Sequence, residues 1–392
     1  MPMTAEHDAF RDGVRRFVAR ELAPHVEAWD EAGSFPRTLY RRAAELGLLG
    51  LGYPDAYGGT PADGWYRLIV TEEIARAGSG GLMASLFSHN IGLPPIVAHA
   101  SEALKRRVVP GVLAGEKIAA LAVTEPSGGS DVARLRCRAR RDGDAWVITG
   151  EKTFITSGLR ADWITLAVRT GLDEAQRGGA GISLIAVPGD APGLTRTPLA
   201  KMGWWCSDTA TLRFDGCRVP ADHLIGTENA GFRMIMENFN DERLLLAAGA
   251  CAFAQVCYDE ALAWARERRT FGAKLVEHQA IRHKLMDMRM RIASTRAWLH
   301  ALVEQREAGV AHDNDHHNAA PPPDWIAELC LLKNHATQTM QWCADAAVQI
   351  LGGMGYMRGT KSERIYREVK VMMIGGGAEE IMKELAARQL GV

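Results

Sequence analysis

A segment rich in glycine and hydroxyl side chains is the first candidate for chemistry. Residues 122–131 read AVTEPSGGSD. Glycine has no Cβ, so the backbone N–H groups of such a segment can approach an anion closely. The segment could therefore hold a phosphate, but it lacks the G-x-G-x-x-G and G-K-[ST] patterns of established phosphate loops. A turn between two strands explains the same composition, and the segment alone does not decide between the two.

One carboxylate beside a buried segment is the candidate for acid–base chemistry. Glu242 and Arg243 stand immediately before the longest apolar run, residues 244–254. This run is much shorter than a membrane-spanning helix requires, so we expect a buried helix and no integral membrane segment. An ion pair between Glu242 and a neighbouring helix would also explain a glutamate at this position.

Metal chemistry is not indicated by the sequence. The polar run at 311–318, AHDNDHHN, has metal-ligating side chains, but it is followed by three prolines at 321–323 and is more typical of a mobile loop between helices. The seven cysteines are scattered and never spaced as C-x-x-C, which argues against a disulfide framework or a zinc site. We expect no metal and a reducing, cytoplasmic location, which an N-terminus without the apolar core of a signal peptide also favours.

The overall charge excludes a general affinity for polyanions. Among 392 residues, 46 are Lys or Arg and 47 are Asp or Glu, which gives a formal net charge of -1. This balance provides no overall attraction to nucleic acid or to an anionic membrane surface, so any anionic ligand must be held by local contacts. With hydrophobic residues at 47%, the chain can bury a large core.

The elements that must position these residues follow the order helical, β, helical. Helical spacing covers residues 6–115, short β-rich runs between turn signals cover 118–224, and long helical patterns return from Gly231. We expect an α+β protein with an N-terminal helical domain (1–117), a middle antiparallel β-domain (118–228) shaped as a small barrel or sandwich, and a C-terminal helical bundle (229–392). The expected bundle helices cover 231–268, 276–309, 324–351 and 379–390.

The motifs, taken in order, resemble those of the acyl-CoA dehydrogenase family over nearly the whole chain. After the TEPSGGSD segment come EKTFITSG at 151–158, SDT at 207–209, RRTFG at 268–272 and QILGGMGY at 349–356. A glycine triplet precedes the last helix, at 375–377. So many motifs in one order are highly specific, and they imply the helical–β–helical fold of that family and a homotetramer.

The resemblance implies FAD as the cofactor. The residues that would line the flavin of their own subunit are Leu121, Thr124, Ser130, Phe154 and Thr156. The residues that would reach FAD across a subunit interface are Arg268, Phe271, Gln279, Gln349, Gly352 and Gly353. Phe154 stands where many relatives have Trp; its aromatic face can still pack on the flavin ring, without an indole N–H to donate.

The family carries its catalytic base at one of two positions, and only one of them is a carboxylate here. In many members the base lies in the loop before the final helix, where this chain has Gly376. The long-chain and isovaleryl-CoA type carries it immediately before an Arg, on the helix that opens with Gly-Phe. The resemblance therefore implies Glu242 as the catalytic residue. The implied substrate contacts are Ser130, Asn240, Arg243 and Gly377.

The implied reaction is the α,β-dehydrogenation of an acyl-CoA thioester to the trans-2-enoyl-CoA, as in fatty acid β-oxidation. We expect electrons to pass to an electron-transfer flavoprotein, since no strand–G-x-G-x-x-G–helix unit for NAD occurs. Two alternatives stay open: a flavin oxidase or monooxygenase on the same fold, and a non-catalytic acyl-CoA-binding paralogue. The second is suggested by Gly376 and by Ala378, where the family usually has Thr.

Overall fold

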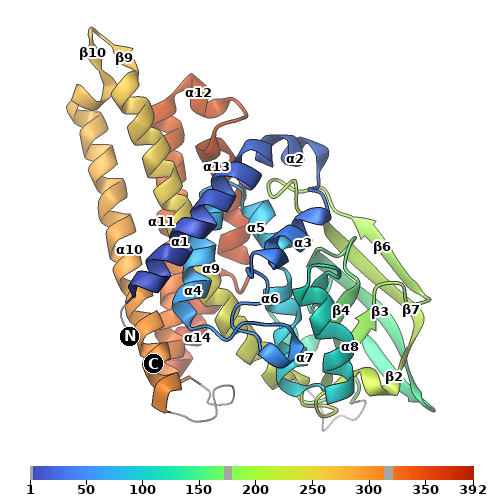
Figure 1. The fold of residues 1–392 in the computed structure, drawn as a ribbon. Helices are drawn as coiled ribbons and strands as arrows, with labels where there is room; N and C mark the ends of the chain where they lie inside the picture. The colour runs from blue at the N-terminus through green and yellow to red at the C-terminus, as the bar shows by residue number, and fades with distance from the viewer. Residues whose placement is uncertain (1–2, 172–178, 313–320) are drawn as a thin grey trace.

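The order helical, β, helical is confirmed by a computed structural model that describes residues 3–171, 179–312 and 321–392 (Figure 1). In the N-terminal region, three helices are capped by Asp63, Ser79 and Ser101. The side chain of each capping residue accepts a hydrogen bond from an N–H group in the first turn of its helix. The helices are α1 (Ala5–Phe17), α2 (Val26–Ala32), α3 (Thr38–Glu45), α4 (Gly64–Ala75), α5 (Gly80–Leu86), α6 (His89–Gly92), α7 (Pro94–His99) and α8 (Glu102–Leu113).

The middle region is one eight-stranded sheet with the strand order β6-β7-β3-β2-β4-β5-β8, and β1 pairs with β4. Its strands are β1 (Ala119–Ala122), β2 (Arg138–Asp142), β3 (Ala145–Thr156), β4 (Trp163–Arg169), β5 (Ile182–Pro188), β6 (Leu194–Pro198), β7 (Thr209–Pro220) and β8 (Leu224–Ile225). The expectation of a purely antiparallel domain is wrong in one respect, because β1–β4 and β2–β4 pair in parallel. The long connection between β1 and β4 lets the chain cross over and return in the same direction.

The C-terminal region is a bundle of long helices. It contains α9 (Gly231–Glu267), α10 (Gln279–His312), α11 (Pro323–Leu351), α12 (Gly353–Tyr356), α13 (Lys361–Ile374) and α14 (Glu379–Leu390). A short hairpin of β9 (Arg269–Thr270) and β10 (Ala273–Lys274) joins α9 to α10. The helix α13, which was not among the predicted helices, leads directly into the glycine triplet.

Most of the apolar run after Glu242 is buried, as expected. Residues 244–246 of α9 are partly buried and residues 247–254 are all buried; all of the latter except Gly249 belong to the largest apolar cluster, with side chains of α10 and α11. Within the described residues, α9 is the one helix whose length and composition would suffice to cross a membrane, and 67% of its most apolar window is buried inside the protein.

The His- and Asp-rich run lies largely outside the described residues, which omit 313–320. Among the residues that are described, no group of three or more His, Cys, Asp or Glu side chains is placed to hold a metal ion. All seven cysteines are buried free thiols.

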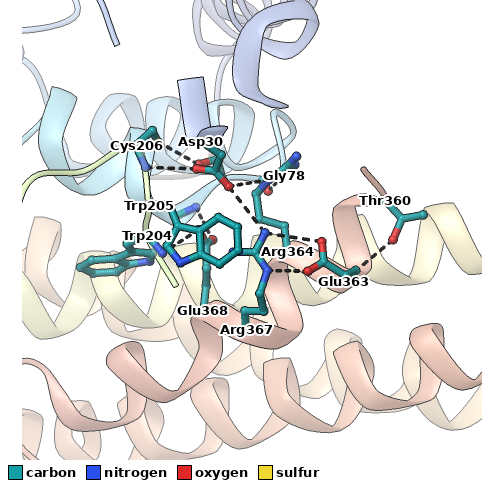
Figure 2. Close-up of polar contacts among 12 residues, drawn as sticks. Asp30, Gly78, Trp204, Trp205, Cys206, Thr360, Glu363, Arg364, Arg367 and Glu368 are labelled. Atoms are coloured by element: carbon teal, nitrogen blue, oxygen red, sulfur yellow. Dashed lines mark hydrogen bonds and ion pairs between the residues drawn. The ribbon is translucent and has the colours of Figure 1, made fainter. Parts of the chain in front are cut away.

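A buried carboxylate, Asp30 of α2, connects the three regions (Figure 2). It accepts a hydrogen bond of 3.0 Å from Nε of Arg364 on α13 and one of 3.1 Å from the backbone N–H of Cys206, in the loop before β7. Arg367 adds a second cation at 3.6 Å and stacks over the ring of Trp205. Each region thus supplies a part of one polar cluster.

A second buried carboxylate, Glu368, belongs to the same cluster (Figure 2). It accepts hydrogen bonds from the backbone N–H of Gly80 at 2.7 Å and of Trp204 at 3.2 Å. Burial, followed by the charge of Asp30, raises the pKa of Glu368 to about 7. The cluster fixes α13, and therefore the start of the glycine triplet, against both the N-terminal helices and the sheet.

Candidate active site

Glu242 lies on α9 with its carboxylate free of direct partners. Across the described residues, no hydrogen bond or ion pair reaches this side chain, although part of it remains accessible to solvent. The surrounding protein raises the pKa of Glu242 by desolvation, and the charges of Arg243 and Lys333 act in the opposite direction. A carboxylate with a raised pKa and no partner is suited to accept a proton.

Arg243 attaches the glycine triplet to α9 beside Glu242. Its Nε donates to the carbonyl oxygen of Gly376 at 3.0 Å, and its Nη1 donates to Oδ1 of Asn240 at 3.0 Å. Asn240 and Arg243 are three residues apart and so lie on one face of the helix. The structure therefore brings three of the expected substrate contacts, Asn240, Arg243 and Gly377, to the neighbourhood of Glu242.

Lys333 is a second cation at this loop, and it was not predicted from the sequence. The side chain is completely buried on α11, and its Nζ donates to the carbonyl oxygens of Met373 at 2.9 Å and Gly377 at 2.7 Å. Burial lowers the pKa of Lys333 to about 8. The available signal was a single lysine within an apolar stretch of α11, ELCLLKNH at 328–335.

A second group of predicted residues gathers at the ends of β1 and β3. The segment 122–131 is tied to β3 by a buried ion pair of 2.8 Å between Lys152 and Glu125, and Lys152 also donates to the carbonyl oxygen of Val123. The backbone N–H of Thr153 donates to the carbonyl oxygen of Thr124 at 2.9 Å. These contacts hold Leu121 and Thr124 close to the end of β3, which carries Phe154 and Thr156. Ser130 lies further along the same segment and is exposed.

Phe154 is turned out of the sheet by an irregularity in β3. The pairing of β3 with β7 shifts register between Lys152 and Ile155, and Phe154 has a φ of 61°, which a bulky residue rarely adopts. Its side chain is 68% exposed. Such strain in a strand is typical of a functional site, and an exposed ring beside Thr156 offers a flat apolar face to a planar ligand. These residues fit a flavin.

The remaining predicted residues lie elsewhere in the subunit. All six are exposed, and Phe271 is 100% exposed with a φ of 52°: Arg268, Phe271, Gln279, Gln349, Gly352 and Gly353. Figure 1 shows the β9–β10 hairpin and α12 at one end of the C-terminal bundle, away from the sheet. A single subunit does not bring this group to the β1–β3 group.

Further apolar side chains are exposed at the same end of the bundle. Tyr356 is 86% exposed, and Met354 and Met357 are also exposed. With Phe271 they are large apolar side chains exposed at one end of the bundle, and exposed apolar side chains that cluster are usually covered by another molecule.

Three family models match the chain in sequence order: "Acyl-CoA dehydrogenase, N-terminal domain" over residues 4–116, "middle domain" over 120–217 and "C-terminal domain" over 229–391. The chain is 34% identical to the mitochondrial long-chain specific acyl-CoA dehydrogenase of Sus scrofa, over 99% of this chain and 87% of that protein. It is 33% identical to the mitochondrial isovaleryl-CoA dehydrogenase of Oryza sativa, over 98% and 90%.

A solved structure has the same fold along the whole chain. The crystal structure of a probable acyl-CoA dehydrogenase from Mycobacterium abscessus superposes with a TM-score of 0.93 at 46% identity, covering 99% of this chain and 100% of that one. The resemblance found in the motifs is thereby confirmed at the level of sequence and fold: this chain belongs to the acyl-CoA dehydrogenase family, whose members are oxidoreductases acting on acyl-CoA.

Proposed function

We propose that the protein is an FAD-dependent acyl-CoA dehydrogenase that converts an acyl-CoA thioester to the trans-2-enoyl-CoA, with Glu242 as its only catalytic carboxylate. The observation that carries the proposal is the state of Glu242, an unpaired carboxylate of raised pKa next to the glycine triplet. Gly376, at the alternative position, has no side chain to remove a proton. The free carboxylate also argues against a non-catalytic paralogue.

FAD fits the group at the ends of β1 and β3. Phe154 and Thr156 would lie against the flavin ring, while Leu121, Thr124 and Ser130 would line it from the neighbouring segment. When bound, FAD would supply the acceptor for the hydride that leaves the substrate β-carbon. The protein's part is to hold the segment and the strand end in register, which the Lys152–Glu125 ion pair does.

The acid–base step would take place at the α-carbon. The thioester acidifies the α-proton, and Glu242 would accept it while hydrogen bonds to the thioester carbonyl stabilise the developing enolate. In the described chain, the backbone N–H groups of Gly376 and Gly377 have no intramolecular partner and are free to donate. Ser130, Asn240, Arg243 and Gly377 would form the surrounding substrate contacts.

A homotetramer would complete the cofactor site. The exposed residues at the far end of the bundle would reach the FAD of another subunit, where Arg268 could pair with pyrophosphate oxygens. The residues proposed for this contact are Arg268, Phe271, Gln279, Gln349, Gly352 and Gly353. The exposed apolar surface around Phe271 supports this assembly, because a subunit interface would cover it.

Electrons would pass to an electron-transfer flavoprotein in the cytoplasm, as part of fatty acid β-oxidation. Turnover with NAD as sole acceptor would contradict this. Slow reoxidation of the substrate-reduced flavin in air would distinguish a dehydrogenase from an oxidase or monooxygenase, for which reoxidation is fast.

The test is anaerobic bleaching of the bound flavin by a panel of acyl-CoA thioesters. Glu242→Gln keeps the shape of the side chain but removes the proton acceptor, so it should bind FAD and acyl-CoA while reducing the flavin about 10²–10⁴-fold more slowly. Glu380→Gln, at an exposed carboxylate of α14, is the matched control and should behave as wild type. Flavin reduction by Glu242→Gln at the wild-type rate would refute the assignment.

A further inference from the structure

We infer that Lys333 is a positioning residue of the acid–base site, whose ammonium holds the glycine triplet and keeps Glu242 ionised until it takes a proton. The inference rests on the proposed role of Glu242. Lys333 would not touch the reacting atoms and would act through the carboxylate and the loop.

The first support is the geometry of the ammonium. Lys333 is 0% exposed, and its Nζ donates at 2.9 Å to Met373, in the last turn of α13, and at 2.7 Å to Gly377, just before α14. One lysine on α11 therefore joins both ends of the glycine triplet. Arg243 holds the carbonyl of Gly376 between these two points, so the cations that fix the loop are also those that face Glu242.

The second support is the arrangement of charge around Lys333. The groups that act on Lys333 are Glu242 and Arg243 on α9, Cys330 on the same helix as Lys333, and Glu379 on α14. Glu242 is the strongest of these influences and favours the charged lysine, whereas Arg243 opposes it. The charges of Arg243 and Lys333 in turn favour the ionised form of Glu242, so they oppose the rise in its pKa that burial causes. The two groups form no direct ion pair within the described chain, so the ammonium acts through space.

A purely structural role does not explain why this donor is charged. Burying an ammonium is costly, and a neutral amide could donate to the same carbonyl oxygens. What an amide cannot supply is a positive charge next to the base. Without that charge, Lys333 would no longer oppose the effect of burial, and the pKa of Glu242 would rise further. More of the carboxylate would then be protonated at neutral pH, where it has to accept a proton.

The experiment measures the titration of Glu242 itself, by infrared difference spectroscopy of the holoenzyme across a pH series. The carboxylic acid band that disappears in Glu242→Gln identifies the residue. In Lys333→Gln, which keeps a donor for the loop, the titration midpoint should rise by about one pH unit, in line with the loss of a nearby opposite charge. The acid limb of the flavin-reduction profile should move by the same amount. A folded Lys333→Gln protein with the wild-type midpoint would overturn the inference.

Two further variants make the result specific. Lys361 of α13 also has its pKa lowered by burial and donates to a backbone carbonyl, that of Arg76 at 2.8 Å, but it faces Glu260 and Asp259 instead of Glu242. Lys361→Gln should therefore leave the midpoint of Glu242 unchanged, and an equal shift in this variant would contradict a local effect. If Lys333→Gln does not fold, Lys333→Arg must keep the wild-type midpoint, because the charge remains; a raised midpoint there would overturn the inference.

Failure of this inference can be told apart from failure of the proposed function. The infrared titration needs no turnover. An enzyme that reduces its flavin through Glu242 but shows no shift in Lys333→Gln would refute the role of Lys333 alone. A shift in a protein that no acyl-CoA can reduce would instead refute the proposed reaction.

Discussion

A Cβ atom placed on Gly376 would lie 3.9 Å from the carboxyl carbon of Glu242. Two elements that are far apart in the sequence, α9 and the loop after α13, therefore reach the same point of the site. In this chain a carboxylate carried by either element would therefore approach the same point.

Exchange of the base between the two positions should restore part of the activity. Glu242→Gly with Gly376→Glu moves the carboxylate to the loop, but the new Cβ would lie 2.7 Å from Cδ1 of Leu246, and Gly376 has a φ of +67°, at a cost of about 1–3 kcal/mol for a non-glycine residue. Leu246→Ala removes the clash. The triple variant should reduce the flavin at least about tenfold faster than Glu242→Gly with Leu246→Ala, by stopped-flow absorbance. Equal rates in two folded proteins would contradict the shared geometry.

Glu368 should make the protein less stable as the pH rises. Its pKa is about 7 in the folded state and about 4.5 ordinarily, so the folded state binds the proton more tightly. The stabilisation is complete below about pH 4.5 and is lost as the pH rises through about 7, a change of about 3 kcal/mol. Glu368→Gln should lack this component. Denaturant unfolding at pH 5 and pH 8 should show a smaller loss of stability in the variant, and parallel losses would show that Glu368 is not the group responsible.

Loss of Lys152 should release the segment that lines the proposed flavin site. Lys152→Met leaves Glu125 buried without its cation, which typically costs about 3–5 kcal/mol. We expect a lower thermal midpoint and a lower FAD content, measured by the flavin-to-protein absorbance ratio. Adding Glu125→Gln removes the unpaired charge and should recover part of the stability; a double variant less stable than Lys152→Met would contradict this account.

Assembly and FAD retention should be lost together when the far end of the bundle is altered. Phe271→Ser with Arg268→Ala removes an exposed ring and a cation proposed to contact a neighbouring subunit. We expect smaller particles and less bound FAD in gel filtration with light scattering, because each subunit would complete the site of another. Glu267→Gln, at an exposed residue of the same helix end, is the control. A monomer with full FAD occupancy would contradict the proposed assembly.

Local patterns in the sequence predicted the order of regions and the buried run of α9, but not the irregular strand end at Phe154. Contacts between segments that are far apart in the sequence could not be predicted from local patterns. The parallel contact of β1 with β4 depends on how the connecting chain crosses over, and α13 presents its polar groups to a buried cluster, which weakens the usual apolar pattern of a helix.

At the candidate site, the sequence predicted a carboxylate with an adjacent cation but not the second cation, Lys333. Glu242 and Arg243 are adjacent in sequence and were found from their motif. Lys333 was not predicted, because its contact with the loop that follows α13 depends on the fold and not on the neighbouring sequence. Charges that act through space leave no spacing pattern in a single sequence.

The bond between Asp30 and Arg364 also has a consequence for how the chain is made. The two residues are 334 positions apart, so a ribosome that adds 5–20 residues per second needs roughly 20–70 s to pass from one to the other. Throughout that interval a carboxylate destined for the interior has no guanidinium to neutralise it, and burying it unpaired would be costly. Asp30 can therefore take its final buried and ion-paired position only when nearly the whole chain has been translated.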